Sequence, residues 1–319
     1  MSNIEFKYQN KVSSIRENVS KVIVGKESVT DLVITALLAG GHVLLEDVPG
    51  TGKTMLAKTF AKTLDSEFRR IQFTPDLLPS DITGINFYNQ KEGDFVFRRG
   101  PLFGNIILAD EINRATPRTQ SALLECMEER QVTVDGQTSR LESPFIVIAT
   151  QNPIETAGTY QLPEAQLDRF LLKVSMGYPK REEEISIISR FLFDSPIDTV
   201  SPVCSKQEIT EMIRETKNVY VHEAVMGYIT DIVNATRNNE NVSVGVSIRG
   251  TLNMVNAARA YAYVQGRGYV VPEDIYTLSV PVFAHRIVLK RGMTSRDNRE
   301  ELIKEILDTV NVPTEDWNK

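Results

Sequence analysis

The sequence predicts an α/β fold, in which helices cover both faces of a parallel sheet, followed by a smaller all-α domain. Over the first half of the chain, short apolar runs typical of buried strands alternate with amphipathic helical segments. A glycine-rich loop joins the first of these runs to a helix, which is the context of a phosphate-binding loop. After about residue 180 the strand patterns stop and amphipathic helices follow. We therefore expect a P-loop αβα sandwich at 1–180 and a helical domain at 181–319.

The expected elements of the first domain follow from hydrophobic periodicity. Strands are predicted at 43–46, 69–73, 105–109, 145–150 and 171–176. Helices are predicted at 11–21, 28–39, 53–64 and 116–129. Strands that are joined through helices run parallel and bury both of their faces. The alternation therefore predicts one parallel sheet between two layers of helix.

Two segments interrupt this alternation. Within 84–100, apolar and polar residues alternate on both sides of Lys91-Glu92-Gly93. Within 131–142, Asp135-Gly136 separates two short alternating runs, and Asp-Gly is a strong hairpin turn. We interpret both segments as surface hairpins inserted into the α/β core.

The second domain is predicted from three helical patterns. One helix has a single apolar face, made of Val221, Val225, Tyr228, Ile229, Ile232 and Val233. Another has a face made of Ile248, Leu252, Val255, Ala258 and Ala262. A third begins at Pro272-Glu273-Asp274, because proline and acidic residues favour the first helical turn.

Composition narrows the class of protein. No apolar run approaches the roughly 18 residues that span a bilayer, and the N-terminus lacks a secretory signal pattern, so we expect a cytoplasmic protein without membrane insertion. A net charge of −6 makes nucleic acid an unfavourable partner. Cys126 and Cys204 form no paired motif, and we expect Cys126 to be a buried apolar residue.

The loop Asp47-Val-Pro-Gly-Thr-Gly-Lys-Thr54 carries the clearest chemistry. Gly50 and Gly52 let the backbone turn its amides inward, and the following helix N-terminus adds to an anion site. Lys53 supplies positive charge to the outer phosphates, and the Thr54 hydroxyl suits Mg²⁺. Asp47 stands where the strict pattern has glycine, which is unfavourable unless its carboxylate points away or caps an amide. The expected nucleotide contacts of the loop are Pro49, Gly50, Thr51, Gly52, Lys53, Thr54 and Met55.

A second apolar run, 105–109, ends in the carboxylates Asp110 and Glu111. Beside a phosphate loop, Asp110 is expected to hold Mg²⁺ directly or through water. Glu111 is then placed to orient and activate the attacking water.

Together, these motifs resemble the MoxR family of AAA+ ATPases. The stretches that carry the resemblance are the phosphate loop, 72–84, 110–125, 149–153 and 162–170. The resemblance extends over essentially the whole chain and implies an AAA+ core followed by a lid domain. Asp47 also occurs in this family's variant of the loop.

The resemblance implies roles for further residues. Asn152 is similar to the sensor that hydrogen-bonds the γ-phosphate or the attacking water. Arg169 resembles an arginine finger offered to a neighbouring subunit, where a permanently charged planar fork suits a transferring phosphoryl group. Arg249 resembles the second sensor, reaching from the lid to the γ-phosphate, although Ile248 stands where the family more often has proline. Val24 and Gly25 resemble the segment that packs on adenine.

The expected function is Mg²⁺-dependent hydrolysis of ATP to ADP and phosphate. ATP is favoured over GTP because the chain lacks an Asn-Lys-x-Asp guanine motif. The resemblance implies a homo-oligomeric ring, most often a hexamer, that remodels or matures a client protein. It also implies a partner protein with a von Willebrand factor A domain. Arg114 and Arg118 either face a neighbouring subunit or are solvated on a helix, and the pairs Arg69-Arg70 and Arg98-Arg99 are expected on solvated faces.

Three other functions stay open at this point. Related helicases also carry hairpin insertions, but acidity and the lack of interleaved basic and aromatic residues weigh against a nucleic-acid motor. An intact Glu111, Asn152 and Arg169 weigh against a nucleotide-gated scaffold with little turnover. A metal-chelatase motor subunit is not separated from a remodelling ATPase by the sequence.

Overall fold

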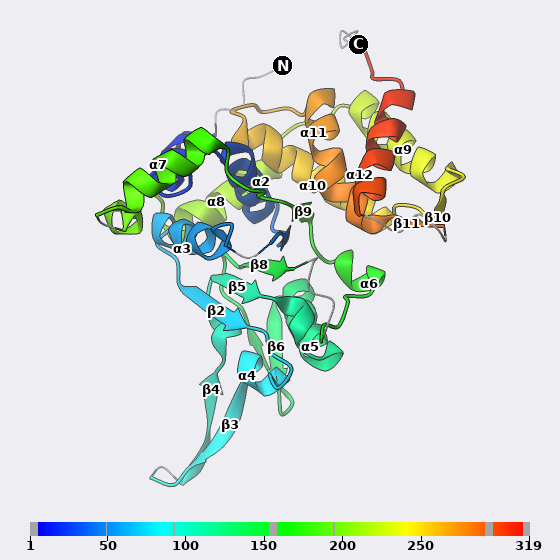
Figure 1. Cartoon of the computed structure of the whole chain (residues 1–319). Helices are drawn as coiled ribbons and strands as arrows, with labels where there is room; N and C mark the ends of the chain where they lie inside the picture. Colours follow the sequence, from blue (N-terminus) through cyan, green and yellow to red (C-terminus); the bar gives the residue numbers. More distant parts are fainter. Residues whose placement is uncertain are drawn as a thin grey trace.

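The computed structural model describes residues 6–48, 50–91, 93–152, 158–193, 195–290 and 296–314. Its centre is a five-stranded parallel sheet with the strand order β2-β5-β8-β1-β9 (Figure 1). The strands are β1 (Val43–Glu46), β2 (Phe68–Gln72), β5 (Ile106–Asp110), β8 (Ile146–Gln151) and β9 (Leu172–Val174). The predicted strands are thus confirmed, with ends that differ by one or two residues. The order places β1 between β8 and β9, so the strands that carry the phosphate loop and the acidic pair are separated only by β8.

Helices cover both faces of this sheet. In β1, the side chains of Val43 and Leu45 belong to one apolar cluster, whereas Leu44 belongs to another, as expected for alternating strand residues. The first cluster includes α1 (Lys11–Ser20), α2 (Glu27–Leu38) and α3 (Lys53–Thr63). The second includes the short α4 (Pro79–Thr83) and α5 (Pro117–Glu129). The αβα sandwich is therefore confirmed.

Both predicted hairpins are present. One consists of β3 (Gly84–Asn89) and β4 (Asp94–Arg99), and it projects from the body of the molecule (Figure 1). The other consists of β6 (Gln131–Val134) and β7 (Gln137–Arg140). Its turn residues Asp135 and Gly136 both have positive φ, 50° and 79°, as a type I′ turn requires. Asn86 donates to the Asp135 carboxylate at 2.8 Å and so links the two hairpins.

The second half of the chain is mainly helical. Its helices are α7 (Arg181–Phe191), α8 (Lys206–Thr216), α9 (Glu223–Asn238), α10 (Ile248–Val264), α11 (Pro272–Phe283) and α12 (Arg296–Thr309). Short segments join the elements: α6 (Glu164–Leu167) and the 3-10 turns η1 (Pro101–Phe103), η2 (Ile112–Arg114), η3 (Pro196–Thr199) and η4 (Ala284–Arg286). Strands β10 (Val242–Val244) and β11 (Val288–Leu289) form a small antiparallel ribbon that the sequence did not predict. Such short strands are below the length at which alternation can be recognised.

Most of these helices share the apolar cluster on the α1–α3 side of the sheet, so the core is continuous between the two halves. The domain boundary near residue 180 stays a prediction. The predicted apolar face of α10 is wrong in part, because Ile248 and Leu252 are 66% and 60% exposed. The helix instead buries a face of small residues, including Gly250, Ala257 and Ala258, which allows close packing. No helix in the described residues is long and apolar enough to cross a membrane.

Candidate nucleotide site and arginine pair

The phosphate loop lies between β1 and α3, as predicted. Gly50 and Gly52 have φ values of +85° and +90°, a conformation that side-chain-bearing residues rarely adopt. A Cβ atom built at either glycine would meet nothing within 4 Å, so the loop is open where a ligand would enter. Thr54 and Met55 lie in the first turn of α3, where free amides favour an anion. Pro49 lies outside the described residues.

Lys53 spans this loop. Its Nζ donates to the carbonyl oxygens of Asp47 at 2.8 Å and Val48 at 3.2 Å, and Thr51 Oγ1 lies 3.4 Å from the same Val48 carbonyl. Burial lowers the pKa of Lys53, and nearby carboxylates partly offset this effect. Phosphate oxygens would be better partners for this ammonium than neutral carbonyls.

The Asp47 carboxylate points away from the loop. It accepts from the Ser175 hydroxyl at 2.8 Å, the Met176 amide at 2.5 Å and the Gly177 amide at 3.0 Å. This contact explains why an acid is tolerated at a position where the strict loop has glycine. The carboxylate joins the loop to the chain segment that follows β9.

Asp110 and Glu111 lie at the same edge of the sheet, at the end of β5. Thr150, in the neighbouring β8, organises both of them: its hydroxyl donates to Asp110 Oδ1 at 2.7 Å and accepts from the Glu111 amide at 2.8 Å. Glu111 has φ 57° and ψ 51°, a left-handed conformation that is uncommon for glutamate. Such backbone conformations concentrate at functional sites.

Strand β2 supplies polar partners to both acids. Arg70 Nη2 lies 2.7 Å from Asp110 Oδ2, and Gln72 donates to Glu111 Oε2 at 2.8 Å. The Glu111 carboxylate also pairs with Arg114 Nε at 3.2 Å. Arg70 is exposed, as predicted, but it also pairs with Asp110, which the sequence did not indicate. Parallel register could have indicated these partners, since Gln72 lies opposite Asp110.

The other residues that were expected to contact the nucleotide, Asn152, Val24 and Gly25, lie near the carboxyl ends of the strands. Asn152 is buried and directly follows β8, whose Gln151 carbonyl accepts from the Asp47 amide at 3.2 Å. Gly25 has φ +66°, and a Cβ there would lie 2.2 Å from the Glu183 carboxyl group. The segment containing Val24 and Gly25 therefore lies against the start of α7.

Arg169 and Arg249 lie together at the other edge of the sheet. Both bind Glu128 of α5: Arg169 Nε at 3.2 Å and Arg249 Nη2 at 2.6 Å. They line a cavity of about 260 Å³ with Gly40 and His42, which precede β1, whereas the phosphate loop follows β1. At about 3.3 Å per residue, β1 alone separates the two edges by roughly 13 Å. Arg249 therefore does not contact the described residues of the phosphate loop of its own chain, in contrast to the expectation from the sequence.

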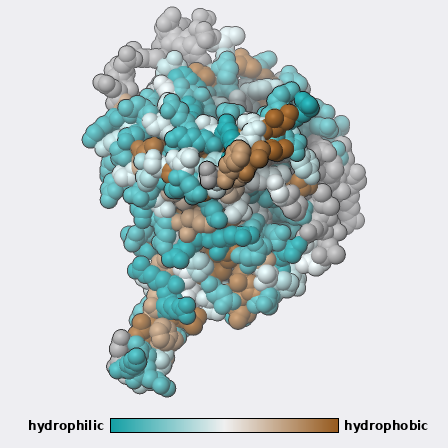
Figure 2. All heavy atoms as spheres, turned by 60° about the vertical axis from the view of Figure 1, so that its left-hand side comes forward, coloured by the Kyte–Doolittle hydropathy of each residue, from teal (hydrophilic) through white to brown (hydrophobic). Residues whose placement is uncertain are grey.

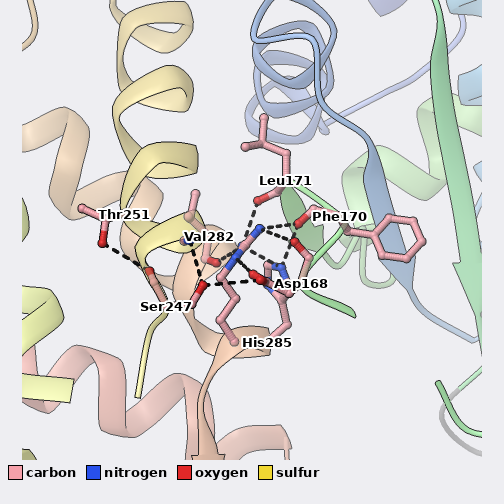
Figure 3. Close-up of polar contacts among 9 residues, drawn as sticks. Asp168, Phe170, Leu171, Ser247, Thr251, Val282 and His285 are labelled. Atoms are coloured by element: carbon pink, nitrogen blue, oxygen red, sulfur yellow. Dashed lines mark hydrogen bonds and ion pairs between the residues drawn. The ribbon is translucent and has the colours of Figure 1, made fainter. Parts of the chain in front are cut away.

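Arg286 fixes the chain beside Arg169. Its buried guanidinium pairs with Asp168 Oδ1 at 2.7 Å and donates to the carbonyls of Phe170 at 2.6 Å and Leu171 at 3.2 Å (Figure 3). Burial lowers the pKa of Arg286 to about 10, and Asp168 opposes that shift. His285 packs in the same group, with Nε2 3.1 Å from the Phe170 carbonyl. The turn η4 thereby holds the segment that presents Arg169.

The residues present fit a magnesium nucleotide. The Thr54 hydroxyl and Asp110 carboxylate are hard oxygen donors on α3 and β5 at one sheet edge, and oxygen is the ligand that Mg²⁺ prefers. The open glycine loop and Lys53 provide the adjoining anion cradle. Parallel sheet, phosphate loop, acidic strand end and helical lid define an AAA-type ATPase.

Comparison with known proteins gives the family. Residues 42–172 match the ATPase family associated with various cellular activities (AAA), and 234–306 match the AAA lid domain. The chain is 50% identical to YeaC of Bacillus subtilis over 94% of both chains. It is 43% identical to Chaperone MoxR1 of Mycobacterium tuberculosis over 92% of this chain and 80% of that protein. A solved structure of a candidate ATPase from Cytophaga hutchinsonii covers 96% of both chains, with 41% identity and a TM-score of 0.88. The chain belongs to the MoxR family of AAA+ ATPases.

Proposed function

We propose that this chain hydrolyses ATP with Mg²⁺ in a homo-oligomeric ring and uses the energy to remodel or mature a client protein. The resemblance to its family favours a hexameric ring. The observation that carries the proposal is the division of the site between two edges of the sheet. Lys53, Asp110 and Glu111 lie at the carboxyl ends of the strands, whereas Arg169 and Arg249 lie beside the start of β1. A second copy, placed head to tail, would bring both arginines to the phosphates of the first.

Each residue then has a defined role. Lys53 and the amides of the loop bind the phosphates, while Thr54 and Asp110 would hold Mg²⁺, which would supply positive charge to the phosphates. Glu111 takes a proton from the attacking water, and Asn152 orients that water or the γ-phosphate. Arg169 and Arg249 stabilise negative charge on the phosphoryl group from the neighbouring copy. This assignment replaces the in-cis reach of Arg249 with action in trans.

Two variants test the chemistry. Glu111→Gln is expected to bind ATP within a few-fold of the parent and to lose at least about 10²-fold in turnover. Lys53→Ala is expected to lose binding as well, because it removes a phosphate contact made in the ground state. Near-parental turnover of Glu111→Gln would reject the assignment.

Mixing variants tests the action in trans. Arg169→Ala and Glu111→Gln are each expected to be inactive, since an arginine finger contributes about 10³–10⁵ in rate. In mixed rings, an intact Glu111 on one copy can meet an intact Arg169 on the next. ATPase activity of the mixture above the sum of the two variants supports the proposal. If the subunits are shown to exchange and the mixture still recovers no activity, independent action in trans is contradicted.

We propose a protein with a von Willebrand factor A domain as the partner, on the basis of the family resemblance. With ATP, the Glu111→Gln variant would stay in its ATP-bound, assembled state. Proteins that bind to it in a pull-down can then be identified by mass spectrometry. Capture that depends on ATP and is lost with Lys53→Ala is the expected result.

A further inference from the structure

Helix α7 differs from an ordinary surface helix. All eleven of its residues lie in the described part of the chain, and none is buried. Ile185 and Ile188 of this helix, and Leu192 directly after it, are spaced i, i+3 and i+7 and are 49%, 57% and 61% exposed. We call these three residues the α7 stripe. A helix of this length is marginal without packing of its apolar face, so the stripe indicates a partner surface.

A second apolar stripe is exposed on α10. It consists of Ile248, Leu252 and Val255, spaced i, i+4 and i+7, and we call it the α10 stripe; Val255 is half-buried and packs partly against the core. The opposite face of α10 is buried, with Gly250 and Ala257 on it. The helix therefore has a second apolar side, which a single copy leaves exposed at Ile248 and Leu252.

The two stripes flank the two halves of the divided nucleotide site. The α7 stripe follows the segment held by Asp47 at the phosphate-loop edge, and Glu183 of α7 lies against Gly25. The α10 stripe adjoins Arg249, and Ser247 at the start of α10 lies 3.4 Å from Asp168. Asp168 precedes β9 and Gly177 follows it, so the stripes lie at opposite ends of that strand. Figure 1 shows α7 on the left, with α10 and then β10 farther to the right.

Charge is complementary at the margins of the stripes. The first turn of α7 has three glutamates and one arginine, and Glu182 and Glu184 are exposed. Beside the α10 stripe, Arg249 is half exposed, and Arg237 donates to the Val246 carbonyl at 2.9 Å. Figure 2, which brings the α7 side forward, shows hydrophobic residues gathered among hydrophilic ones on this part of the surface.

We propose that the α7 stripe of one copy packs against the α10 stripe of the next copy of this chain. The proposal rests on the proposed function, because the same head-to-tail placement brings Arg249 to the neighbour's phosphate loop. Two different surfaces meet at such a heterologous interface, which closes into a ring when the rotation allows. The stripes are too small to form a whole stable interface and would be the apolar part of a larger one.

The test uses one charged substitution in each stripe, in a Glu111→Gln background with ATP and Mg²⁺. We expect Ile188→Glu and Leu252→Glu each to raise the protein concentration at the midpoint of assembly at least about tenfold, as measured by sedimentation velocity. Met226→Glu is the matched control, since Met226 is an exposed apolar residue of α9, and it should leave the midpoint unchanged. Circular dichroism checks that the variants fold, and a fluorescent ATP analogue checks that they still bind nucleotide.

A mixture of the two charged variants, Ile188→Glu and Leu252→Glu, tests the pairing more directly than either variant alone. Each charged variant retains one intact stripe, so an equimolar mixture can form one good interface and should stop at a one-to-one heterodimer. Ile188→Cys in one copy and Leu252→Cys in another should also cross-link with a short bismaleimide, because Cys126 and Cys204 are buried. A heterodimer and a cross-link between the two variants would support this pairing.

Other outcomes separate the two proposals. If both charged variants assemble like the parent, the docking surface is overturned while the ring stands. If Leu252→Glu assembles normally and Ile188→Glu does not, α7 meets another surface and the pairing is overturned. If the stripes control assembly but the chain binds no ATP, the proposed function fails and the docking surface stands. A parent that stays monomeric under all conditions overturns both.

Discussion

The Asp47 carboxylate and the Gly177 amide are 3.0 Å apart, which ties the first residue of the phosphate loop to the segment leading into α7. The same carboxylate also binds the Met176 amide and the Ser175 hydroxyl. A change in the loop on nucleotide binding would therefore act directly on the base of α7. This contact joins the ATP site to the surface that we propose for the neighbouring copy.

Removal of this carboxylate should destabilise the chain. Asp47→Ala leaves two amides, one of them buried, without an acceptor, and we expect a loss of about 2–3 kcal/mol in the free energy of unfolding. Urea unfolding measures this loss, and faster hydrogen exchange at Met176 and Gly177 should accompany it. Asp231→Ala, at an exposed position of α9, should change stability by less than about 0.5 kcal/mol. Equal effects of the two substitutions would contradict the role of Asp47.

Arg70 should compete with magnesium for Asp110. Their ion pair is partly exposed and is worth about 0–1 kcal/mol, so Arg70→Ala should lower the Mg²⁺ concentration for half-maximal turnover by up to about fivefold. A titration of turnover with Mg²⁺ at saturating ATP measures this. Arg69→Ala is the matched control, because Arg69 pairs with Glu67 instead. A higher Mg²⁺ requirement in Arg70→Ala would mean that Arg70 assists metal binding.

The ion pair of Asp168 with Arg286 should matter more than a surface pair. Asp168→Ala leaves a buried guanidinium without its countercharge, and we expect a loss of about 3–5 kcal/mol in unfolding free energy. Glu164→Ala breaks the more exposed pair with Arg299 and should cost less than about 1 kcal/mol. Denaturant unfolding of both variants gives the comparison. Similar losses would show that carbonyl contacts alone hold Arg286.

Two buried histidines predict a dependence of stability on pH. Burial lowers the pKa of His42 to about 3, and burial also lowers the pKa of His285 well below its usual value. Both are neutral when folded but take up a proton near pH 6.5 when unfolded, so stability is fully present above pH 6.5 and is lost as pH falls below it. Between pH 7 and pH 5, each of the two histidines should lower the free energy of unfolding by about 2 kcal/mol.

Urea unfolding at several pH values from 7.5 to 5 measures this loss. His42→Gln should remove about half of the pH dependence, whatever its effect on stability at pH 7.5. The His42 ring accepts from the Val147 amide at 2.9 Å and contacts the Met127 carbonyl at 3.0 Å, so a neutral ring has two partners. Unchanged stability between pH 7.5 and pH 5 would show that the rings protonate without unfolding.

The sequence was most informative where one local pattern determines one structure. The strands, the hairpin turn at Asp135-Gly136 and the glycine loop were all predictable, because periodicity and positive φ leave few alternatives. The bond of Gln72 with Glu111 was missed, since it depends on which strands are neighbours in the sheet.

The position of Arg249 could not be predicted for a related reason. Its distance from the phosphate loop depends on how the lid packs on the core, and no local pattern encodes that arrangement. The apolar spacing of Ile248 and Leu252 was real, but it could not indicate that a second, small-residue face would pack inside. Periodicity reports that a surface is apolar, not which molecule covers it.

The projecting β3–β4 hairpin has the geometry of a lever. Its six paired positions extend over about 20 Å at about 3.3 Å per residue. At its base, Gly84 and Gly100 pack so closely on backbone that a Cβ would lie within 2.4 Å and 2.3 Å of carbonyl oxygens. A tilt of about 10° at this pivot would sweep the far end through about 3.5 Å, as follows from the arm length. Tyr88 and Phe95, whose ring centroids are 5.5 Å apart, lie on the arm where displacement is amplified.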